Sequence, residues 1–202
     1  MTAVYMKIKN SLERFIFGYK NNIQDLDDVY QFKDIESISS GAFDPVYDFK
    51  QIYFDAKLQR IEKEAFKNCE NLEVFCCGKT DTNGNFGIEN ISIHDLKLSK
   101  SVTQPDKGKT SAATTFTTET RAFSGCEKLH TVILPNCDKL IIEKNAFEDC
   151  CGLRTFICSS DSISFTENPF EGCSEDLVFI GLKDSGLERF ARENGYGFIN
   201  VQ

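Results

Sequence analysis

One short pattern is repeated along the chain and limits what the chain can fold into. It reads AFKNCENL at 65–72, AFSGCEKL at 122–129, AFEDCCGL at 146–153 and PFEGCSEDL at 169–177. The phenylalanines that align, at 43, 66, 123, 147 and 170, are separated by 23, 57, 24 and 23 residues. A unit of this length cannot bury its own apolar face, so successive units must stack into a solenoid with one continuous core.

Several other positions recur in register with the phenylalanine, and together they predict columns of like side chains through the core. Alanine precedes it in four copies, at 42, 65, 122 and 146, and Pro169 takes that place in the last copy. An apolar residue stands five positions before it in four copies, whereas Thr118 interrupts that column. The cysteines and leucines that follow are Cys69, Cys126, Cys150 and Cys173, then Leu72, Leu129, Leu153 and, one position displaced, Leu177.

Each copy also carries two segments rich in β-formers, which predict short parallel strands on two walls. The segments after the cysteine are 72–77, 129–135, 153–158 and 177–181. Those before the phenylalanine, at 35–39, 58–62, 140–143 and 162–165, are expected to form short strands or irregular turns on the opposite wall. One coil therefore contributes one segment to each wall.

The two ends of the chain are expected to form helical caps, because the last coils of a solenoid expose apolar ladders unless they are covered. Apolar residues from Tyr5 to Tyr19 recur at three- and four-residue steps, which predicts an amphipathic helix. Its lysines and arginine, at 7, 9, 14 and 20, also leave open a membrane-surface role. At the other end, Ser185 and Glu188 form a capping box, Gly195 suits a helix end, and 198–201 reads as a last strand.

The long interval between Phe66 and Phe123 is expected to hold one further coil and about ten extra residues, by the period of the repeat. The stretch IENISI at 88–93 predicts a degenerate strand there. The Thr-, Ser- and Lys-rich segment 100–120 predicts a loop that bulges from the solenoid, either with a function of its own or merely solvated.

These residues resemble the BspA-like, or Treponema-type, leucine-rich repeat family. The pattern is clearest in IEKEAFKNCENLEVF at 61–75 and IEKNAFEDCCGLRTFI at 142–157, and residues 185–201 resemble the family's closing segment. The resemblance implies a leucine-rich-repeat solenoid, an α/β-type repeat fold of mostly short parallel strands and loops, with helical N- and C-terminal caps. We divide the chain into a cap at 1–34, repeats at 35–181 with an insertion near 78–120, and a C-terminal helix and strand at 182–202. The resemblance also implies adhesion roles at the surface or in secretion, and no catalytic residues.

Composition and the N-terminal sequence indicate which kinds of partner and which cellular location to expect. A net charge of −8 argues against nucleic acid, whose recognition needs a basic surface. No apolar run is long enough for a membrane span. The N-terminus lacks the apolar core of a signal peptide, which makes a cytoplasmic location the default against the surface location that the resemblance implies. The sequon at Asn90 would matter only in a secreted eukaryotic protein.

The nine cysteines and two histidines do not predict a reactive centre. Cys126 and His130 are four residues apart, but no second pair completes a metal site, and we predict no metal or cofactor. The recurring cysteines are expected to be free thiols that pack as small apolar groups, with a disulfide framework as the alternative. No nucleophile, zinc-protease, P-loop or dinucleotide motif occurs, so we expect no enzyme.

We therefore predict a non-enzymatic binding module that presents one wall of strands to a protein or glycan partner. The alternative is a structural scaffold domain with no ligand of its own. Alternation along the C-terminal strands predicts that six side chains point outward and are exposed, namely His130, Thr131, Ile133, Arg154, Thr155 and Ile157.

Overall fold

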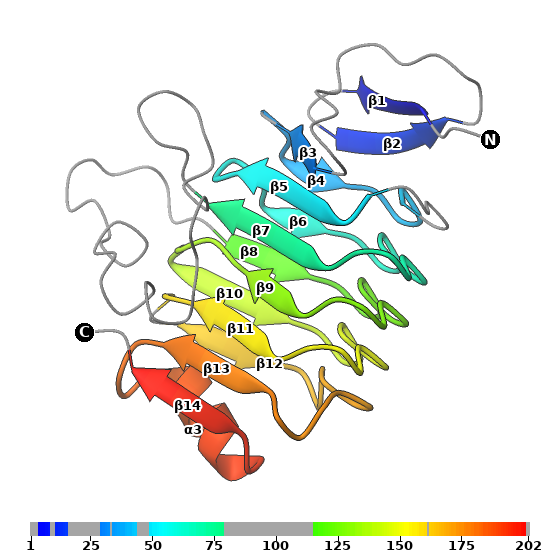
Figure 1. Ribbon diagram of the computed structural model, residues 1–202. Coiled ribbons are helices and arrows are strands. Elements are labelled where there is room, and N and C mark those ends of the chain that lie inside the picture. The colour runs from blue at the N-terminus through cyan, green and yellow to red at the C-terminus, as the bar shows by residue number, and fades with distance from the viewer. Residues whose placement is uncertain are drawn as a thin grey trace.

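Two parallel sheets face each other and run the length of a stack of coils (Figure 1). The computed structural model describes residues 4–8, 11–15, 29–32, 34–43, 49–78, 115–160 and 162–200. Each sheet has seven strands, and the strands of one coil pair with the equivalent strands of the coils before and after it. The fold is the predicted leucine-rich-repeat solenoid, made mostly of strands with one short helix among the described residues.

The first sheet has the order β1-β2-β4-β6-β8-β10-β12 and the second has the order β14-β13-β11-β9-β7-β5-β3. Apart from the β1–β2 pair, the described pairings are parallel, as stacked coils require. The first-sheet strands are β1 (Val4–Ile8), β2 (Ser11–Phe15), β4 (Ser37–Ile38), β6 (Arg60–Ile61), β8 (Thr115–Thr118), β10 (Lys139–Ile142) and β12 (Ile163–Phe165). The second-sheet strands are β3 (Val29–Phe32), β5 (Gln51–Asp55), β7 (Val74–Gly78), β9 (Thr131–Ile133), β11 (Thr155–Cys158), β13 (Val178–Gly181) and β14 (Gly197–Asn200).

The recurring phenylalanine forms one continuous column of stacked rings in the core. Neighbouring ring centroids along the column are 4.5 Å apart for Phe43 and Phe66, 4.8 Å for Phe66 and Phe123, 5.0 Å for Phe123 and Phe147 and 5.3 Å for Phe147 and Phe170. The rings are within 9° of parallel. Each of the first four phenylalanines also donates its backbone N–H to the carbonyl of the residue before the next phenylalanine, for example from Phe66 to Ala122 at 2.7 Å. The expected like-with-like stacking is confirmed.

The recurring cysteine does more than fill space. The Cys126 thiol donates to the Phe66 carbonyl of the preceding coil at 3.1 Å, and Cys150 donates to the Phe123 carbonyl at the same distance. Cys69 and Cys173 make the equivalent bonds to Phe43 and Phe147. All nine cysteines of the chain are free thiols in the structure. The thiol therefore joins two coils by a weak hydrogen bond, which packing arguments from the sequence did not anticipate.

Two recurring positions of the repeat adopt a left-handed backbone. The residue before the cysteine does so in four copies, and its identities are Asn68, Gly125, Asp149 and Gly172. Asparagine, aspartate and glycine are the residues that tolerate this conformation best. The residue before the alanine is also left-handed, and here Glu64 and Arg121 occupy it with φ of 58°. The turns that separate the two sheets are therefore fixed by backbone geometry as well as by packing.

The expected extra coil between Phe66 and Phe123 is not there. β6 pairs directly with β8, matching Ile61 with Thr118, and β7 pairs directly with β9. Because the rings of Phe66 and Phe123 are in contact, no coil can lie between them. The extra residues are instead an insertion between β7 and β8. The loop expected at 100–120 extends too far, because its residues 115–118 form the strand β8. The strand expected at 88–93 lies outside the described residues.

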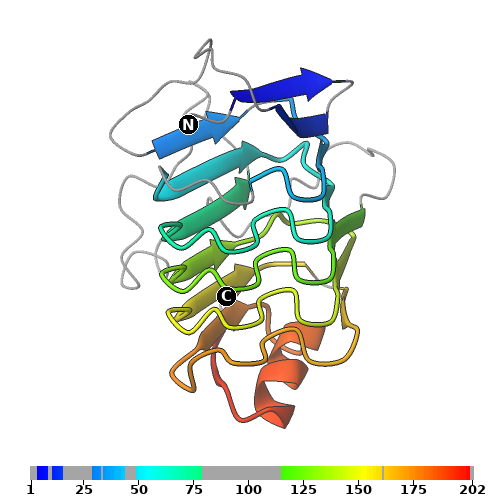
Figure 2. The same cartoon turned by 90° about the vertical axis from the view of Figure 1, so that its right-hand side faces the viewer.

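The expected N-terminal helix is wrong for the described residues. Val4–Ile8 and Ser11–Phe15 form an antiparallel hairpin, and β2 then pairs in parallel with β4, matching Leu12 with Ile38. A strand satisfies the open edge of β4 with backbone hydrogen bonds, which a helix cannot do. Figure 2 shows this hairpin at one end of the stack and α3 at the other.

The C-terminal cap is the predicted helix and strand. α3 (Gly186–Glu193) begins at the N-cap Ser185, whose hydroxyl accepts from the Glu188 N–H at 3.3 Å. The Glu188 carboxylate reaches back to the Asp184 N–H at 2.6 Å, one residue earlier than a standard capping box. Leu187 and Ala191 are buried, and the ring of Phe190 stacks on Phe165 at the end of the core. The helix thus covers the apolar end of the last coil.

Candidate functional site

The outer side of the second sheet carries an apolar row that is separate from the core. Inward side chains such as Val132 and Phe156 belong to the main core, whereas their neighbours Ile133 and Ile157 belong to a second cluster. Strand pairing aligns the equivalent residues of five successive strands. We call these five residues the outer row, and they are Tyr53, Cys76, Ile133, Ile157 and Ile180.

The side chains of the outer row are almost fully buried, although they lie on the outer side of the sheet. Its members keep only 2–7% of their surface exposed. Four apolar neighbours pack against it and are partly exposed, and these border residues are Val74, Val178, Leu182 and Ile199. Ile199 extends the row to the last strand, because β14 pairs with β13 and matches Ile199 with Ile180.

Only some of the six residues predicted for this face are accessible. His130 and Arg154 are exposed and Thr131 is half-buried. Ile133, Thr155 and Ile157 are buried, which contradicts the expectation that alternation would expose them. Alternation sets which side of a sheet a residue faces, but it does not determine whether another part of the molecule covers that side.

The two exposed residues among these six, His130 and Arg154, stand just before the strands. Their backbones are linked, since the N–H groups of Arg154 and Thr155 both donate to the His130 carbonyl. The His130 ring lies 2.8 Å from the Thr131 hydroxyl, between Nδ1 and Oγ1. The Arg154 guanidinium donates to the carbonyls of Cys151 and Leu153, at 2.8 and 3.1 Å. Both side chains are therefore held against their own turns, at the rim of the face.

Tyr53 carries a hydroxyl group at one end of the outer row. Its hydroxyl donates to the Gln51 side-chain carbonyl at 2.6 Å. Burial raises the pKa of Tyr53 to about 12, with a smaller contribution from the neighbouring Cys76. Reasoning from the sequence missed Tyr53, Ile180 and the border residues, although the alternation in QIYFD at 51–55 and in VFIG at 178–181 is the signal that could have found them.

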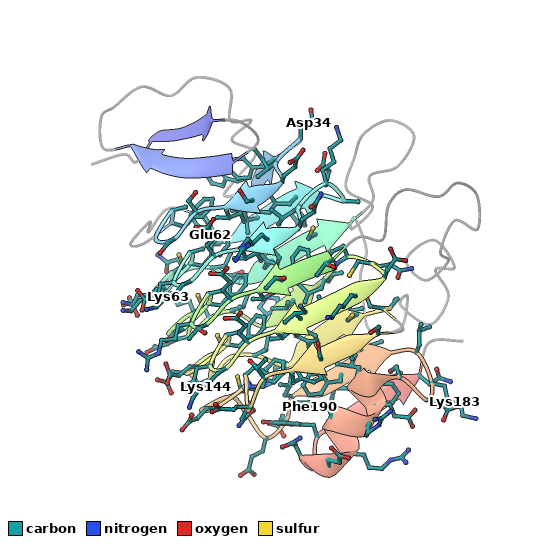
Figure 3. All side chains as sticks on the ribbon, turned by 180° about the vertical axis from the view of Figure 1, so that it is seen from behind. Asp34, Glu62, Lys63, Lys144, Lys183 and Phe190 are labelled. Atoms are coloured by element: carbon teal, nitrogen blue, oxygen red, sulfur yellow. The ribbon has the colours of Figure 1, made fainter. Side chains whose placement is uncertain are left out.

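Charged side chains next to the first sheet make contacts between neighbouring coils. The carboxylates of Glu62, Glu119 and Glu143 accept the backbone N–H groups of Ser40, Lys63 and Thr120, each in the preceding coil, at 2.9–3.1 Å. Ion pairs also join neighbouring coils, among them Arg121 with Glu148 and Lys144 with Glu167. Figure 3 shows Lys63 and Lys144 projecting from the same side of the stack. These carboxylates and ion pairs link neighbouring coils.

The cysteine and histidine residues considered as metal ligands do not come together in the described part of the chain. Among the described residues, no group of three or more His, Cys, Asp or Glu side chains could hold a metal ion. Cys126 is fully buried and hydrogen-bonded to Phe66, while His130 lies on the surface, so this pair does not converge. His94 lies outside the described residues. No helix in the described ranges has the length and apolarity to cross a bilayer.

Stacked coils, two parallel sheets and a recurring phenylalanine column define a leucine-rich-repeat protein with a helical C-terminal cap. The sequence matches the model of the BspA type leucine-rich repeat region over residues 5–109 and 110–185, in six copies, and the chain therefore belongs to this family. No curated protein and no solved structure matches it. The family comprises repeat proteins that are often used in protein–protein or surface interactions and are typically not enzymes.

Proposed function

We propose that the protein is a non-enzymatic binding module that recognises a protein partner through the outer face of its second sheet. The observation that carries the proposal is the outer row with its partly exposed border. The core is complete without these residues, because the inward side chains form a cluster of their own. Apolar side chains that stay accessible outside a core, as the border residues partly do, are characteristic of interaction surfaces.

The composition of this face favours a protein over a glycan. Val74, Val178, Leu182 and Ile199 offer aliphatic surface, and aliphatic side chains supply no hydrogen bonds for sugar hydroxyls. Arg154 adds positive charge at the rim, where charged groups influence association rate and orientation. We propose that the partner packs on the border residues, since the outer row itself is almost covered.

Matched substitutions on the two sheets test the proposal. Val178→Asp and Ile199→Asp place charge on the partly exposed border of the second sheet, and Ile141→Asp places it on a partly exposed outward position of the first sheet. Proteins retained by the immobilised unaltered protein are identified and quantified, and binding of the identified partner is then measured with each variant. We expect the two second-sheet variants to weaken binding at least about tenfold, as loss of a buried contact of 1–2 kcal/mol would do.

The control Ile141→Asp should bind as the unaltered protein does. Equal losses in all three variants would contradict a role for the second sheet. If the unaltered protein retains no specific partner, the scaffold alternative without a ligand is the better account.

A further inference from the structure

A second feature of the structure, independent of the proposed partner, lies where the strands of the second sheet end. Cys158 is the last residue of β11, and Cys137 lies in the connection between β9 and β10. Two hydrogen bonds clamp these segments side by side. The Leu134 N–H donates to the Ile157 carbonyl at 3.0 Å, and the Cys137 N–H donates to the Ser160 hydroxyl at 3.1 Å.

Ser160 brings the two thiols to the same place. The Cys137 sulfur is 3.3 Å from the Ser160 hydroxyl oxygen, and the Ser160 N–H donates to the Cys158 sulfur at 3.4 Å. Ser160 itself is 1% exposed and also donates its hydroxyl to the Pro135 carbonyl. Both sulfurs therefore contact polar atoms of one fixed, buried residue, and they belong to neighbouring coils.

The two thiols differ in how accessible they are to small molecules in solution. Cys137 is partly exposed, whereas Cys158 is 1% exposed. Burial raises the pKa of Cys158 to about 11. Burial also raises the pKa of Cys137, and the hydrogen bond between Cys137 and Ser160 acts in the opposite direction. Both thiols are therefore protonated at neutral pH.

We propose that Cys137 and Cys158 are a site of reversible oxidation by small disulfides, forming a bond that ties the β9–β10 connection to the end of β11. The Cys137 thiol loses its proton and attacks one sulfur of oxidised glutathione, which releases one glutathione thiolate. Cys158 then loses its proton and attacks the Cys137 sulfur, which releases the second glutathione. The two protein thiols are oxidised to one disulfide, and one glutathione disulfide is reduced to two glutathiones.

The test uses the whole, folded protein. It is reduced, desalted and incubated with oxidised glutathione at about pH 8, near the pKa of a free thiol. Remaining thiols are blocked with N-ethylmaleimide, and peptides are mapped by mass spectrometry without reduction. We expect a peptide pair linked through Cys137 and Cys158, together with a glutathione adduct on the exposed Cys151. The linked protein should also melt roughly 6 °C or more above the reduced protein.

Three variants complete the design. Cys137→Ser and Cys158→Ser should each abolish the linked pair, and the control Cys151→Ser should retain it while losing the adduct. The proposal is overturned if Cys137 stays unmodified, stops at a glutathione adduct beside a free Cys158, or links to Cys77 instead. Cys77 is the stringent competitor, because it lies close enough for Cys137 to influence its pKa.

Discussion

At the scale of single residues, the structure shows how the recurring positions of the repeat contribute to stability. The column that stands five residues before the phenylalanine contains Ile61 and Ile142 on either side of Thr118. Thr118 is fully buried, and its hydroxyl has no hydrogen-bond partner among the described residues. A buried hydroxyl without a partner has lost its hydrogen bonds to water and gained none in return.

Thr118→Val should therefore raise the free energy of unfolding by about 1 kcal/mol, because it removes the unsatisfied hydroxyl and keeps nearly the same shape. Urea denaturation followed by circular dichroism measures the change. Thr117→Val, at the adjacent outward and partly exposed position, is the matched control and should change the stability much less. A destabilised Thr118→Val protein would show that the hydroxyl has a partner in solution.

Much at this scale was predictable from the sequence, and the part that was not has clear causes. The phenylalanine column and the buried cysteines follow from side chains that recur at one spacing. The thiol bonds to the Phe66 and Phe123 carbonyls do not, because they depend on where one coil lies over the next. Burial of Ile133 and Ile157 was missed for a related reason, since a strand pattern carries no information about what covers its outer side.

At the scale of elements, buried thiols sit on both sides of the second sheet. Cys77 faces the core from β7, and its neighbour Cys76 faces the outer row. Burial raises the pKa of Cys76 to about 12, against about 8.5–9 for a free thiol. The folded state thus keeps protons that the unfolded chain has already lost, and this must affect stability at alkaline pH.

The sign of the effect follows from the raised pKa. The stabilising contribution of Cys76 is fully present below about pH 9 and is lost as the pH rises towards 12, at up to about 1.4 kcal/mol per pH unit. Urea denaturation under reducing conditions from pH 7 to 11 should show stability that falls steeply above pH 9. Cys76→Ala should make the fall shallower over the same range. An equally steep fall in this variant would exclude Cys76 as a source.

Within the repeats, where packing decides between helix and strand, the type of each element was predictable from the sequence. At the N-terminus it was not. The helix expected there rests on apolar residues at three- and four-residue steps, which a hairpin can carry equally well when its strands are short. The deciding factor is the open edge of β4, which β2 satisfies by pairing. At the C-terminus, Ser185 and Glu188 provide a local capping signal, and the helix prediction is confirmed.

At the scale of the whole molecule, one stack of coils continues across a long insertion. The spacing between Phe66 and Phe123 suggested a hidden coil, because a period counts residues and does not show which of them pair. Direct pairing of β7 with β9 shows that these two strands belong to successive coils. The insertion begins after Gly78, at the end of a strand of the proposed binding sheet.

Coupling between Phe66 and Phe123 tests this continuous stack most directly. We would measure the free energy of unfolding of Phe66→Leu, Phe123→Leu and the double variant, with Phe43→Leu and Phe147→Leu as a matched pair that lies apart in the same column. Stacked rings predict a coupling of about 0.5–1.5 kcal/mol for Phe66 with Phe123, and additive effects for Phe43 with Phe147. Additive effects for Phe66 with Phe123 as well would mean that their rings do not touch, and would contradict the uninterrupted stack.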